Sequence, residues 1–384
     1  MDSYAIDCDF PGGNVLVESI QGNTVTLRQD RRDTEGFWFY WYFRVRGAAG
    51  RTITFQFTDG KPVGVRGAAV SHDKGVTWAW LGSETATENS FTYSFGKNED
   101  SVRFSFAMPY TEANWHLFVD RLDSKRAVTT GALCTSRKGR TVEMLRAGRL
   151  DGKAPVRVSL TARHHCCEMM ANYVMEGILE SVLNDDDPAG CNLREHTEFF
   201  VVPFVDKDGV EDGDQGKNRR PRDHGRDYGT QSIYPESRAI QERITGWSRE
   251  PGNIIVVIDL HCPAIRGYWN EHIYQVGKPE PENWKEQQRL AGCLESSITG
   301  PLPYSADEDL PFGAAWNTTL NYKDGKGFSR WASDLAGVKL ATSFETPYAN
   351  ASGKEVNADS SRAFGQDLSV ALYKYLSSGI KTLP

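Results

Sequence analysis

Two side chains that can bind a metal stand three positions apart in the middle of the chain. They are His165 and Glu168, in the segment TARHHCCEMMANYVMEGILESVL (161–183), where a predicted strand gives way to apolar residues at helical spacing. If a helix begins near Cys166, both side chains lie on one side of its first turn. An imidazole nitrogen and a carboxylate oxygen suit zinc, but such a pair is also common in helix capping and surface ion pairs. A metal site therefore needs a third ligand.

The best third ligand is His261, which ends the apolar segment NIIVVIDLHCP (253–263). In an open α/β sheet the carboxyl ends of the strands form the crevice of the site, so a histidine there can meet the pair. Cys166 and Cys167 are poor candidates, because adjacent residues on a helix point about 100° apart and cannot easily reach one ion. We expect both to be buried as small hydrophobic residues, and His164 to lie behind the pair or in solvent.

Strands alternate with helices from residue 117 to residue 384, which predicts an α/β/α domain with a mixed central sheet. Several strands are continuously apolar, as in a sheet that is buried on both faces. The predicted strands are 140–148, 154–162, 196–206, 253–263 and 337–347, and the predicted helices are 168–183, 237–247, 281–298 and 360–380. The polar, Gly-rich segment 205–229 is too long for an idle turn, so we predict a functional loop there.

Residues 1–116 have a different pattern. Short segments rich in β-branched and aromatic residues are broken about every 10 residues by Gly, Asp and Asn, which is typical of a β-sandwich. These segments are 23–30, 37–47, 51–60 and 101–110. Because 384 residues also exceed the usual size of a single core, we predict an N-terminal antiparallel β-sandwich (1–116) followed by the α/β domain (117–384).

The composition argues against several classes of partner. Lys and Arg number 44 against 51 Asp and Glu, so the net charge of −7 favours neither nucleic acid nor an anionic membrane. No run of about 18 apolar residues predicts a membrane span, and the first residues lack the apolar core of a secretory signal. Seven cysteines without framework spacing fit reduced thiols, so we expect a cytoplasmic protein. The sequence carries no signal for the oligomeric state.

Five segments, in order along the chain, resemble those of zinc carboxypeptidases of the carboxypeptidase A type, and most closely the cytosolic carboxypeptidase subfamily. ARHHCCEMMANYVMEGIL resembles that family's Ala-Arg-x-His-x-x-Glu segment, and VPFVDKDGV resembles Asn-Pro-Asp-Gly. GKNRRPRDHGRDY stands where the family carries Asn-x-Arg and Asp-x-Asn-Arg. VIDLHCP and ATSFETP are similar to the segments of the last zinc ligand and the catalytic glutamate. DFPGGNVLV, FWFYWYFRV and FAMPYTEANW resemble the β-sandwich that precedes the catalytic domain in that subfamily.

The resemblance implies a role for each matching residue. His165, Glu168 and His261 would bind one Zn²⁺ per chain, and Glu345 would be the general base. Arg219 would stabilise the oxyanion, and Arg226 would bind the terminal carboxylate of the substrate. Asp223 would accept a hydrogen bond from a zinc-bound histidine. Each role is physically sound. Zinc lowers the pKa of its bound water to about 7, a nearby carboxylate can take the proton, guanidinium groups stay charged, and an acceptor fixes the histidine tautomer. Without the resemblance, surface arginines and a glutamate at a strand end would be the simpler interpretation.

Two departures affect the expected grip on substrate. The family's asparagine before the carboxylate-binding arginine is Gly225 here, so an amide donor to the terminal carboxylate of the substrate is missing. Either Asn218, His224 or Tyr228 replaces it, or the carboxylate is bound more weakly. Tyr322 stands at about the right distance before the predicted base to close over the substrate, although a plain loop tyrosine is an equal alternative.

Arg330 lies within one residue of the position that sets charge preference in the family. We therefore predict a preference for acidic C-terminal residues. The alternative is that Arg330 pairs with Asp334 one helical turn later.

The sequence thus predicts a zinc metallocarboxypeptidase that removes C-terminal amino acids from peptides or proteins. Two alternatives stay open. Gly225 leaves room for a zinc-dependent N-acyl amino acid amidohydrolase, and a catalytically inactive binding protein would use the sandwich to hold a partner.

Overall fold

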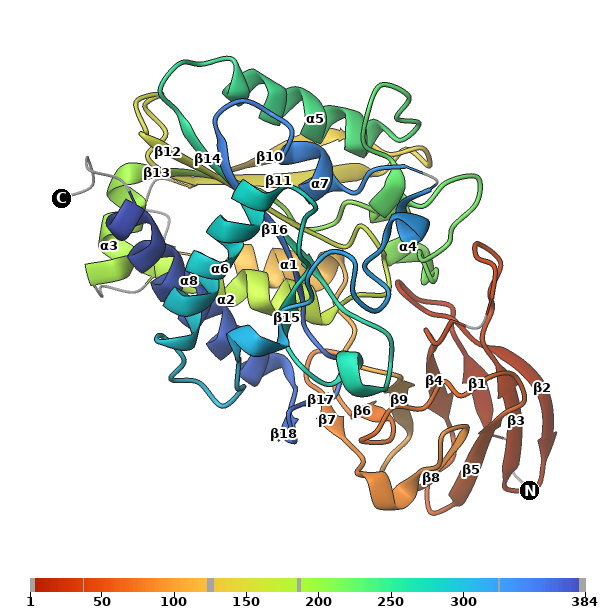
Figure 1. Cartoon of the computed structure of the whole chain (residues 1–384). Coiled ribbons are helices and arrows are strands. Elements are labelled where there is room, and N and C mark those ends of the chain that lie inside the picture. The colour runs from red at the N-terminus through yellow and green to blue at the C-terminus, as the bar shows by residue number, and fades with distance from the viewer. Residues whose placement is uncertain (1–3, 37, 123–127, 185–187, 324, 380–384) are drawn as a thin grey trace.

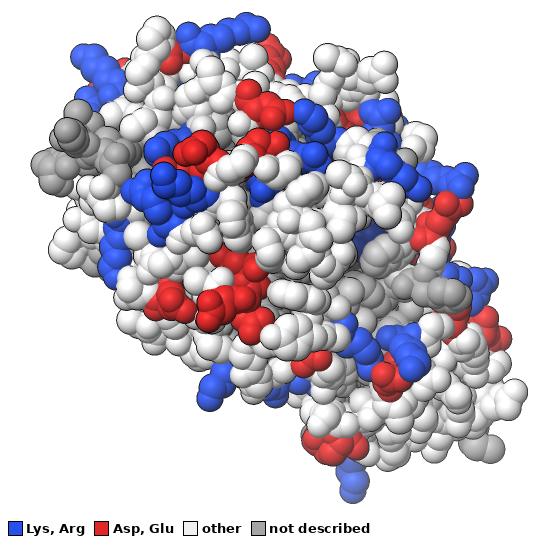
Figure 2. Space-filling view, viewed as in Figure 1, with Lys and Arg blue, Asp and Glu red and all other residues white. Residues whose placement is uncertain are grey.

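The computed structural model describes residues 4–36, 38–122, 128–184, 188–323 and 325–379, which form a β-sandwich packed beside a larger α/β part (Figure 1). No helix of these residues is long and apolar enough to cross a membrane. On the face seen in Figure 2, basic and acidic side chains are interspersed rather than gathered by sign, as the small net charge leads one to expect.

Two sheets form the N-terminal part. One has the order β1-β4-β9-β6-β7 and the other β2-β3-β5-β8, and the pairs are antiparallel except for β3 and β5. Aromatic rings fill the space between the sheets, for example Phe43, Phe55 and Phe104, whose centroids lie 5.3–5.7 Å apart. The strands are β1 (Ala5–Asp7), β2 (Leu16–Gln21), β3 (Thr24–Arg28), β4 (Tyr42–Arg46), β5 (Thr52–Phe57), β6 (Ala69–Ser71), β7 (Ala79–Trp80), β8 (Ser90–Ser94) and β9 (Ser101–Ser105).

A seven-stranded mixed sheet is the centre of the α/β part, with the order β10-β11-β13-β12-β14-β16-β15. The inner pairs β13–β12, β12–β14 and β14–β16 are parallel, and β10, β11 and β15 pair antiparallel. The strands are β10 (Val128–Thr135), β11 (Thr141–Gly148), β12 (Val156–Ala162), β13 (Thr197–Val202), β14 (Ile254–His261), β15 (Tyr274–Gln275), β16 (Val338–Glu345) and the short pair β17 (Asn350–Ala351) and β18 (Lys354–Glu355).

Helices cover both faces of this sheet (Figure 1). In β14, Val256 and Ile258 pack with α2, α6 and α8, whereas Ile255 and Val257 pack with α5 and α7 on the other face. Burial on both faces explains why the strand is apolar throughout. The helices are α1 (Glu112–Val119), α2 (Met170–Asn184), α3 (Pro188–His196), α4 (Lys207–Asp212), α5 (Pro235–Ser248), α6 (Pro281–Glu295), α7 (Phe328–Ala332) and α8 (Ala358–Gly379).

Two expected boundaries differ from the structure. Helix α2 begins at Met170 rather than near Cys166, so the His165–Glu168 pair lies in a turn before the helix. The reason is Arg163, which has a φ of 64° and whose guanidinium donates to the Cys166 carbonyl at 2.7 Å, holding the turn in a non-helical path. The predicted domain boundary at residue 116 falls inside α1, a helix that the sandwich pattern did not predict.

The strand ends place the predicted site residues together. In the parallel pair β14–β16, His261 lies directly opposite Glu345 in the register. Strand β12, on the other side of β14, ends at Ala162, three residues before His165. The carboxyl edge of the parallel strands therefore carries the candidate site.

Candidate metal centre and active site

Two imidazoles and one carboxylate converge at this edge. The Nδ1 atoms of His165 and His261 each lie 2.8 Å from one of the two oxygens of Glu168. These side chains form one of the groups of ligand atoms in the described residues that are close enough to hold one ion. They open on a cavity of about 370 Å³. Nitrogen and oxygen donors at three positions, with an open side, are what a catalytic zinc site requires.

A carboxylate stands behind each of the two histidines. Asp223 Oδ1 is 3.0 Å from His165 Nε2, and Asp259 Oδ2 is 2.8 Å from His261 Nε2. Such acceptors fix which ring nitrogen carries the proton, so that Nδ1 is free to bind a metal. Burial lowers the pKa of His165, but Asp223 and Glu168 outweigh it and raise that pKa to about 9. The surrounding negative charge therefore favours a cation at this point.

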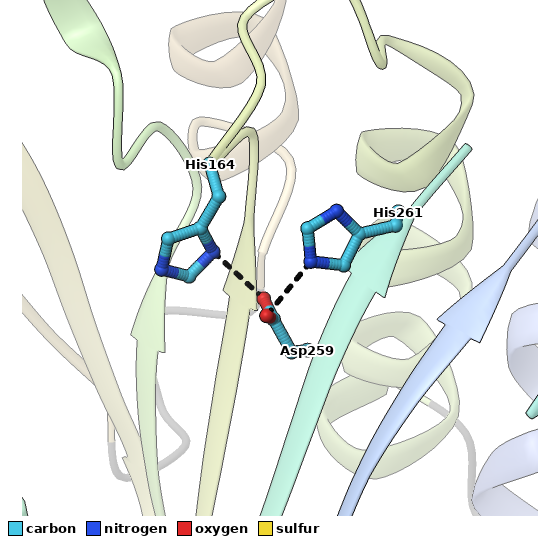
Figure 3. Close-up of side chains that lie close together, drawn as sticks. All are labelled: His164, Asp259 and His261. Carbon is cyan, nitrogen blue, oxygen red and sulfur yellow. Dashed lines mark hydrogen bonds and ion pairs between the residues drawn. The ribbon is translucent and has the colours of Figure 1, made fainter. Parts of the chain in front are cut away.

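A second group of possible ligands shares His261. His164 and His261 lie on either side of Asp259, and His164 Nδ1 is 2.8 Å from Asp259 Oδ1 (Figure 3). The other nitrogen of His164 is hydrogen-bonded to the Tyr228 hydroxyl at 2.6 Å, and the His164 side chain is fully buried. His164 is not among the residues that line the cavity, so this group suits the support of His261 better than catalysis.

Glu345 ends β16 and lines the same cavity. Its Oε2 atom is buried and has no hydrogen-bond partner among the described residues. Burial raises the pKa of Glu345 to about 7; His261 opposes this shift and Glu168 adds to it. A carboxyl group with a pKa near neutrality can both accept and release a proton during turnover.

The close packing around Gly225 explains the absence of the family's asparagine. A Cβ atom at Gly225 would lie 2.8 Å from His165 Nε2 and 3.0 Å from Asp223 Oδ1, which leaves no room for a larger side chain. The next residue, Arg226, lines the cavity and donates to the Gly225 carbonyl at 2.7 Å and to the Asn321 carbonyl at 3.1 Å. Its guanidinium is held by backbone groups and faces the space where substrate would lie.

Of the three residues considered as replacements for that amide, Asn218 lines the cavity. His224 is buried, with its ring stacked on Tyr234 at 3.5 Å between centroids, and Tyr228 is engaged with His164. The geometry therefore favours Asn218 as the polar group that can reach a substrate carboxylate.

Tyr322 and Arg330 lie next to each other in the cavity wall. The Tyr322 ring has the Arg226 guanidinium at 4.8 Å and the Arg330 guanidinium at 5.0 Å, and its hydroxyl donates to Asn317 at 3.1 Å. Asp334, the alternative partner of Arg330, is instead paired with Lys326 at 2.5 Å. Arg330 is thus directed to the cavity rather than along its helix.

Arg219 does not lie where an oxyanion-stabilising group is expected. Its guanidinium is paired with Asp206 at 2.5 Å and with Asp214 at 2.9 Å, and a third carboxylate, Asp33, lies 3.6 Å away. It is absent from the residues that line the cavity, whereas Lys217, two positions earlier, is among them. The carboxylates behind the loop hold Arg219 away from the reaction centre.

Many of the residues that line the cavity were not predicted from the sequence. Among them are Trp38, Lys217, Asp259 and Lys278. Asp259 could have been found, because residues two apart in a strand point to the same side and it precedes His261 by two. The others come from a sandwich segment, an irregular loop and a strand connection, where no periodic pattern marks the direction of a side chain.

Two family models match the chain. The model described as zinc carboxypeptidase covers residues 118–231, and the model described as the cytosolic carboxypeptidase N-terminal domain covers residues 6–107. The C-terminal part of the chain is thus similar to zinc carboxypeptidases, and the N-terminal part to the domain that precedes them in cytosolic carboxypeptidases. The resemblance inferred from the sequence motifs is thereby confirmed.

The curated proteins that are similar to this chain match over part of their own length. An uncharacterized protein of Zymomonas mobilis is 28% identical over 211 residues, which are 53% of this chain and 54% of that protein. Cytosolic carboxypeptidase 6 of Caenorhabditis elegans is 26% identical over 182 residues, or 45% and 39%. The chain thus spans about half or less of the length of these two relatives.

Solved structures match nearly the whole chain. A metallo-carboxypeptidase from Burkholderia cenocepacia has a TM-score of 0.79 at 21% identity, covering 98% of this chain and all of that one. A metallo-carboxypeptidase from Pseudomonas aeruginosa, in complex with (2-guanidinoethylmercapto)succinic acid, has a TM-score of 0.73 at 22% identity, covering 97% and 99%. At such identities the likeness shows the fold, and the predicted sandwich and α/β architecture is confirmed.

Proposed function

We propose that the protein is a zinc metallocarboxypeptidase that hydrolyses the last peptide bond of peptides or proteins. The observation that carries the proposal is the convergence of His165, Glu168 and His261 beside the unpartnered, buried carboxyl of Glu345. The family is named for zinc, and this donor set fits one zinc ion per chain. A zinc ion there would polarise the scissile carbonyl and lower the pKa of a bound water. Since several curated relatives are named as cytosolic, we also propose a cytoplasmic location.

In this proposal Glu345 is the general base. It takes one proton from water while the water oxygen bonds to the carbonyl carbon, and it passes that proton to the amide nitrogen as the C–N bond breaks. The products are a free amino acid and a peptide shortened by one residue. A pKa near neutrality allows both transfers at working pH. Asp223 and Asp259 keep the histidines in the tautomer that binds metal.

Recognition of a chain end falls to Arg226. A guanidinium matches a carboxylate with two parallel hydrogen bonds, so it favours a free C-terminus over a mid-chain peptide. Asn218 lies in the same wall and can donate a further hydrogen bond, and the Tyr322 ring beside both arginines can cover the bound residue.

We further propose a preference for acidic C-terminal residues. Arg330 and Lys278 both line the cavity, and the Lys278 ammonium lies 3.4 Å from the Ser343 hydroxyl. Burial lowers the pKa of Lys278 to about 8, so its ammonium is largely charged at neutral pH. Two cations near the side chain of the last residue favour a carboxylate there.

The test is release of the last amino acid from matched peptides by the zinc-loaded protein. Peptides end in Glu, Leu or Lys, each with a free or an amidated C-terminus, and products are counted by mass spectrometry with and without chelator. We expect chelator-sensitive release from free ends only, fastest from Glu. Equal release of Lys or Leu contradicts the acidic preference, and release from amidated ends contradicts the carboxypeptidase assignment.

The two alternatives give other outcomes of the same assay. An amidohydrolase releases amino acids from N-acyl amino acids but not from peptides. A binding protein shows no turnover with either substrate, whether or not it holds metal.

A further inference from the structure

One buried cation at the cavity has no role in the chemistry described so far. The ammonium of Lys217 lies 2.8 Å from Glu168 Oε1 and donates to the backbone carbonyls of Cys262 at 2.9 Å and Pro263 at 3.3 Å. The ring of Trp38, from the sandwich, lies 5.7 Å from it. Lys217 is only 9% exposed, so its position is fixed by these contacts.

The direction of the ammonium is set by its three N–H groups. The carbonyls of Cys262 and Pro263, which directly follow His261, accept two of them. The third is directed to Glu168, the carboxylate that joins the two histidines. Lys217 and Glu168 both line the cavity, so this third N–H is the one that can turn from Glu168 to the carbonyl oxygen of a bound substrate.

Lys217 and Arg219 are two cations of the same loop with different surroundings. Lys217 lines the cavity together with Glu168 and Glu345. The Arg219 guanidinium, by contrast, is ion-paired with Asp206 and Asp214. Of the two, Lys217 is the cation that faces the reaction centre.

We propose that Lys217 is the catalytic residue that stabilises the negative charge on the carbonyl oxygen of the scissile bond. This inference rests on the proposed carboxypeptidase function. It assigns to a lysine of the loop the task that the family resemblance gave to Arg219.

The proposed step transfers no proton from Lys217. As the water oxygen bonds to the carbonyl carbon and Glu345 takes the proton, an electron pair moves onto the carbonyl oxygen. Lys217 donates a hydrogen bond to that oxygen, and the pair returns to the C=O bond when the C–N bond breaks. Because the charge exists only along the reaction path, the interaction raises kcat more than it lowers KM.

The sandwich holds the loop that carries this lysine. The Asp33 carboxylate accepts the backbone N–H of Gln215 at 3.0 Å and of Gly216 at 2.9 Å. The Thr34 hydroxyl donates to the carbonyl of Lys217 itself. These contacts fix the backbone on both sides of the Lys217 Cα, so the N-terminal part positions a proposed catalytic group of the other part.

The experiment compares wild type with Lys217→Met, Lys217→Gln and Lys217→Arg, all loaded with zinc, on a peptide ending in Glu. Lys285→Met, an exposed lysine of α6, is the matched control. We expect kcat to fall by about 10²–10³ in the Met and Gln variants with KM within about threefold, and Arg to recover part of the loss. Zinc content should be unchanged.

A binding readout separates catalysis from structure. The affinity of a phosphonate peptide analogue, which mimics the charged tetrahedral state, should fall by the same factor as kcat, whereas the affinity for the cleaved amino acid should not change. If Lys217→Met and Lys217→Gln keep kcat within about threefold of wild type, or lose zinc and both ligands together, the assignment is overturned. Failure of the wild type to release any amino acid overturns the carboxypeptidase function, and this assignment with it.

Discussion

The sandwich has an apolar core, whereas the carboxyl edge of the mixed sheet holds a buried network of charged and polar side chains. The sandwich is held by aromatic contacts such as Phe43, Phe55 and Phe104. The sheet edge buries imidazoles and carboxylates in one network that includes His165 and Glu168. An apolar core needs only volume and pattern, whereas a buried charged network needs each partner in place.

This difference implies that the sandwich affects activity only through the residues that contact the loops at the carboxyl edge of the sheet. Of its described residues, Trp38 lines the cavity wall, and Asp33 holds the backbone of Gln215 and Gly216. Other contacts between the parts lie further away, such as the bond of Arg66 to the Ala349 carbonyl at 2.9 Å. Mutations at the edge should therefore cost far more activity than mutations in the sandwich, apart from this contact loop.

The largest effect is expected from Glu345→Gln at the sheet edge. The amide cannot take a proton from water, so kcat should fall by about three orders of magnitude or more while zinc stays bound. Steady-state kinetics and metal analysis measure both, with the exposed Glu282→Gln of α6 as the control. Near-normal turnover in Glu345→Gln means that another group is the base.

Loss of the acceptor behind His261 should have the next largest effect. Asp259→Asn removes the charge that holds the His261 tautomer, so zinc affinity should fall by about 10–100-fold. Competition with a chromogenic chelator measures this affinity, and Asp100→Asn, exposed in the sandwich, serves as the control. Equal affinity in wild type and Asp259→Asn shows that the carboxylate does not support the metal site.

A smaller effect is expected from Asp33→Ala in the sandwich. The variant frees the backbone beside Lys217, and slight misplacement of a catalytic group should lower kcat by about tenfold with zinc affinity unchanged. Asp100→Ala, at an exposed position of the sandwich, is the control. If both variants keep full kcat, the sandwich has no part in positioning the loop.

The smallest effect concerns the pH dependence of specificity. Because burial lowers the pKa of Lys278 to about 8, its charge is present below that pH and is lost above it. The preference for C-terminal Glu over Leu should therefore decline a few-fold between pH 7 and 9. In Lys278→Met the ratio should be low and flat across this range, and a ratio that still declines points to another group.

Much of this site could be predicted because its residues stand at the ends of regular strands. His261 and Glu345 end neighbouring parallel strands; the strand-end position alone indicated His261, whereas Glu345 came from the family resemblance. The turn before α2 was harder, because the left-handed Arg163 and its buried bond to Cys166 leave no local pattern.

In the loop 214–220, the sequence alone does not predict which basic side chain faces the cavity. Lys217 and Arg219 are both basic and only two positions apart, so residue type cannot decide which one faces the substrate. The decision comes from Asp33 on the sandwich and from Asp206 and Asp214, contacts between parts distant in the sequence. The parallel pairing of β3 and β5 is likewise a tertiary outcome that strand alternation does not encode.

The central claim is that one zinc ion lies between His165, Glu168 and His261. The most direct measurement is anomalous diffraction at the zinc absorption edge from crystals grown with zinc. We predict one peak per chain, about 2.0–2.2 Å from the Nδ1 atoms of both histidines and from an oxygen of Glu168, with Glu345 not bound to it. A peak within the buried group of His164, Asp259 and His261, or no peak at either place, would contradict the account.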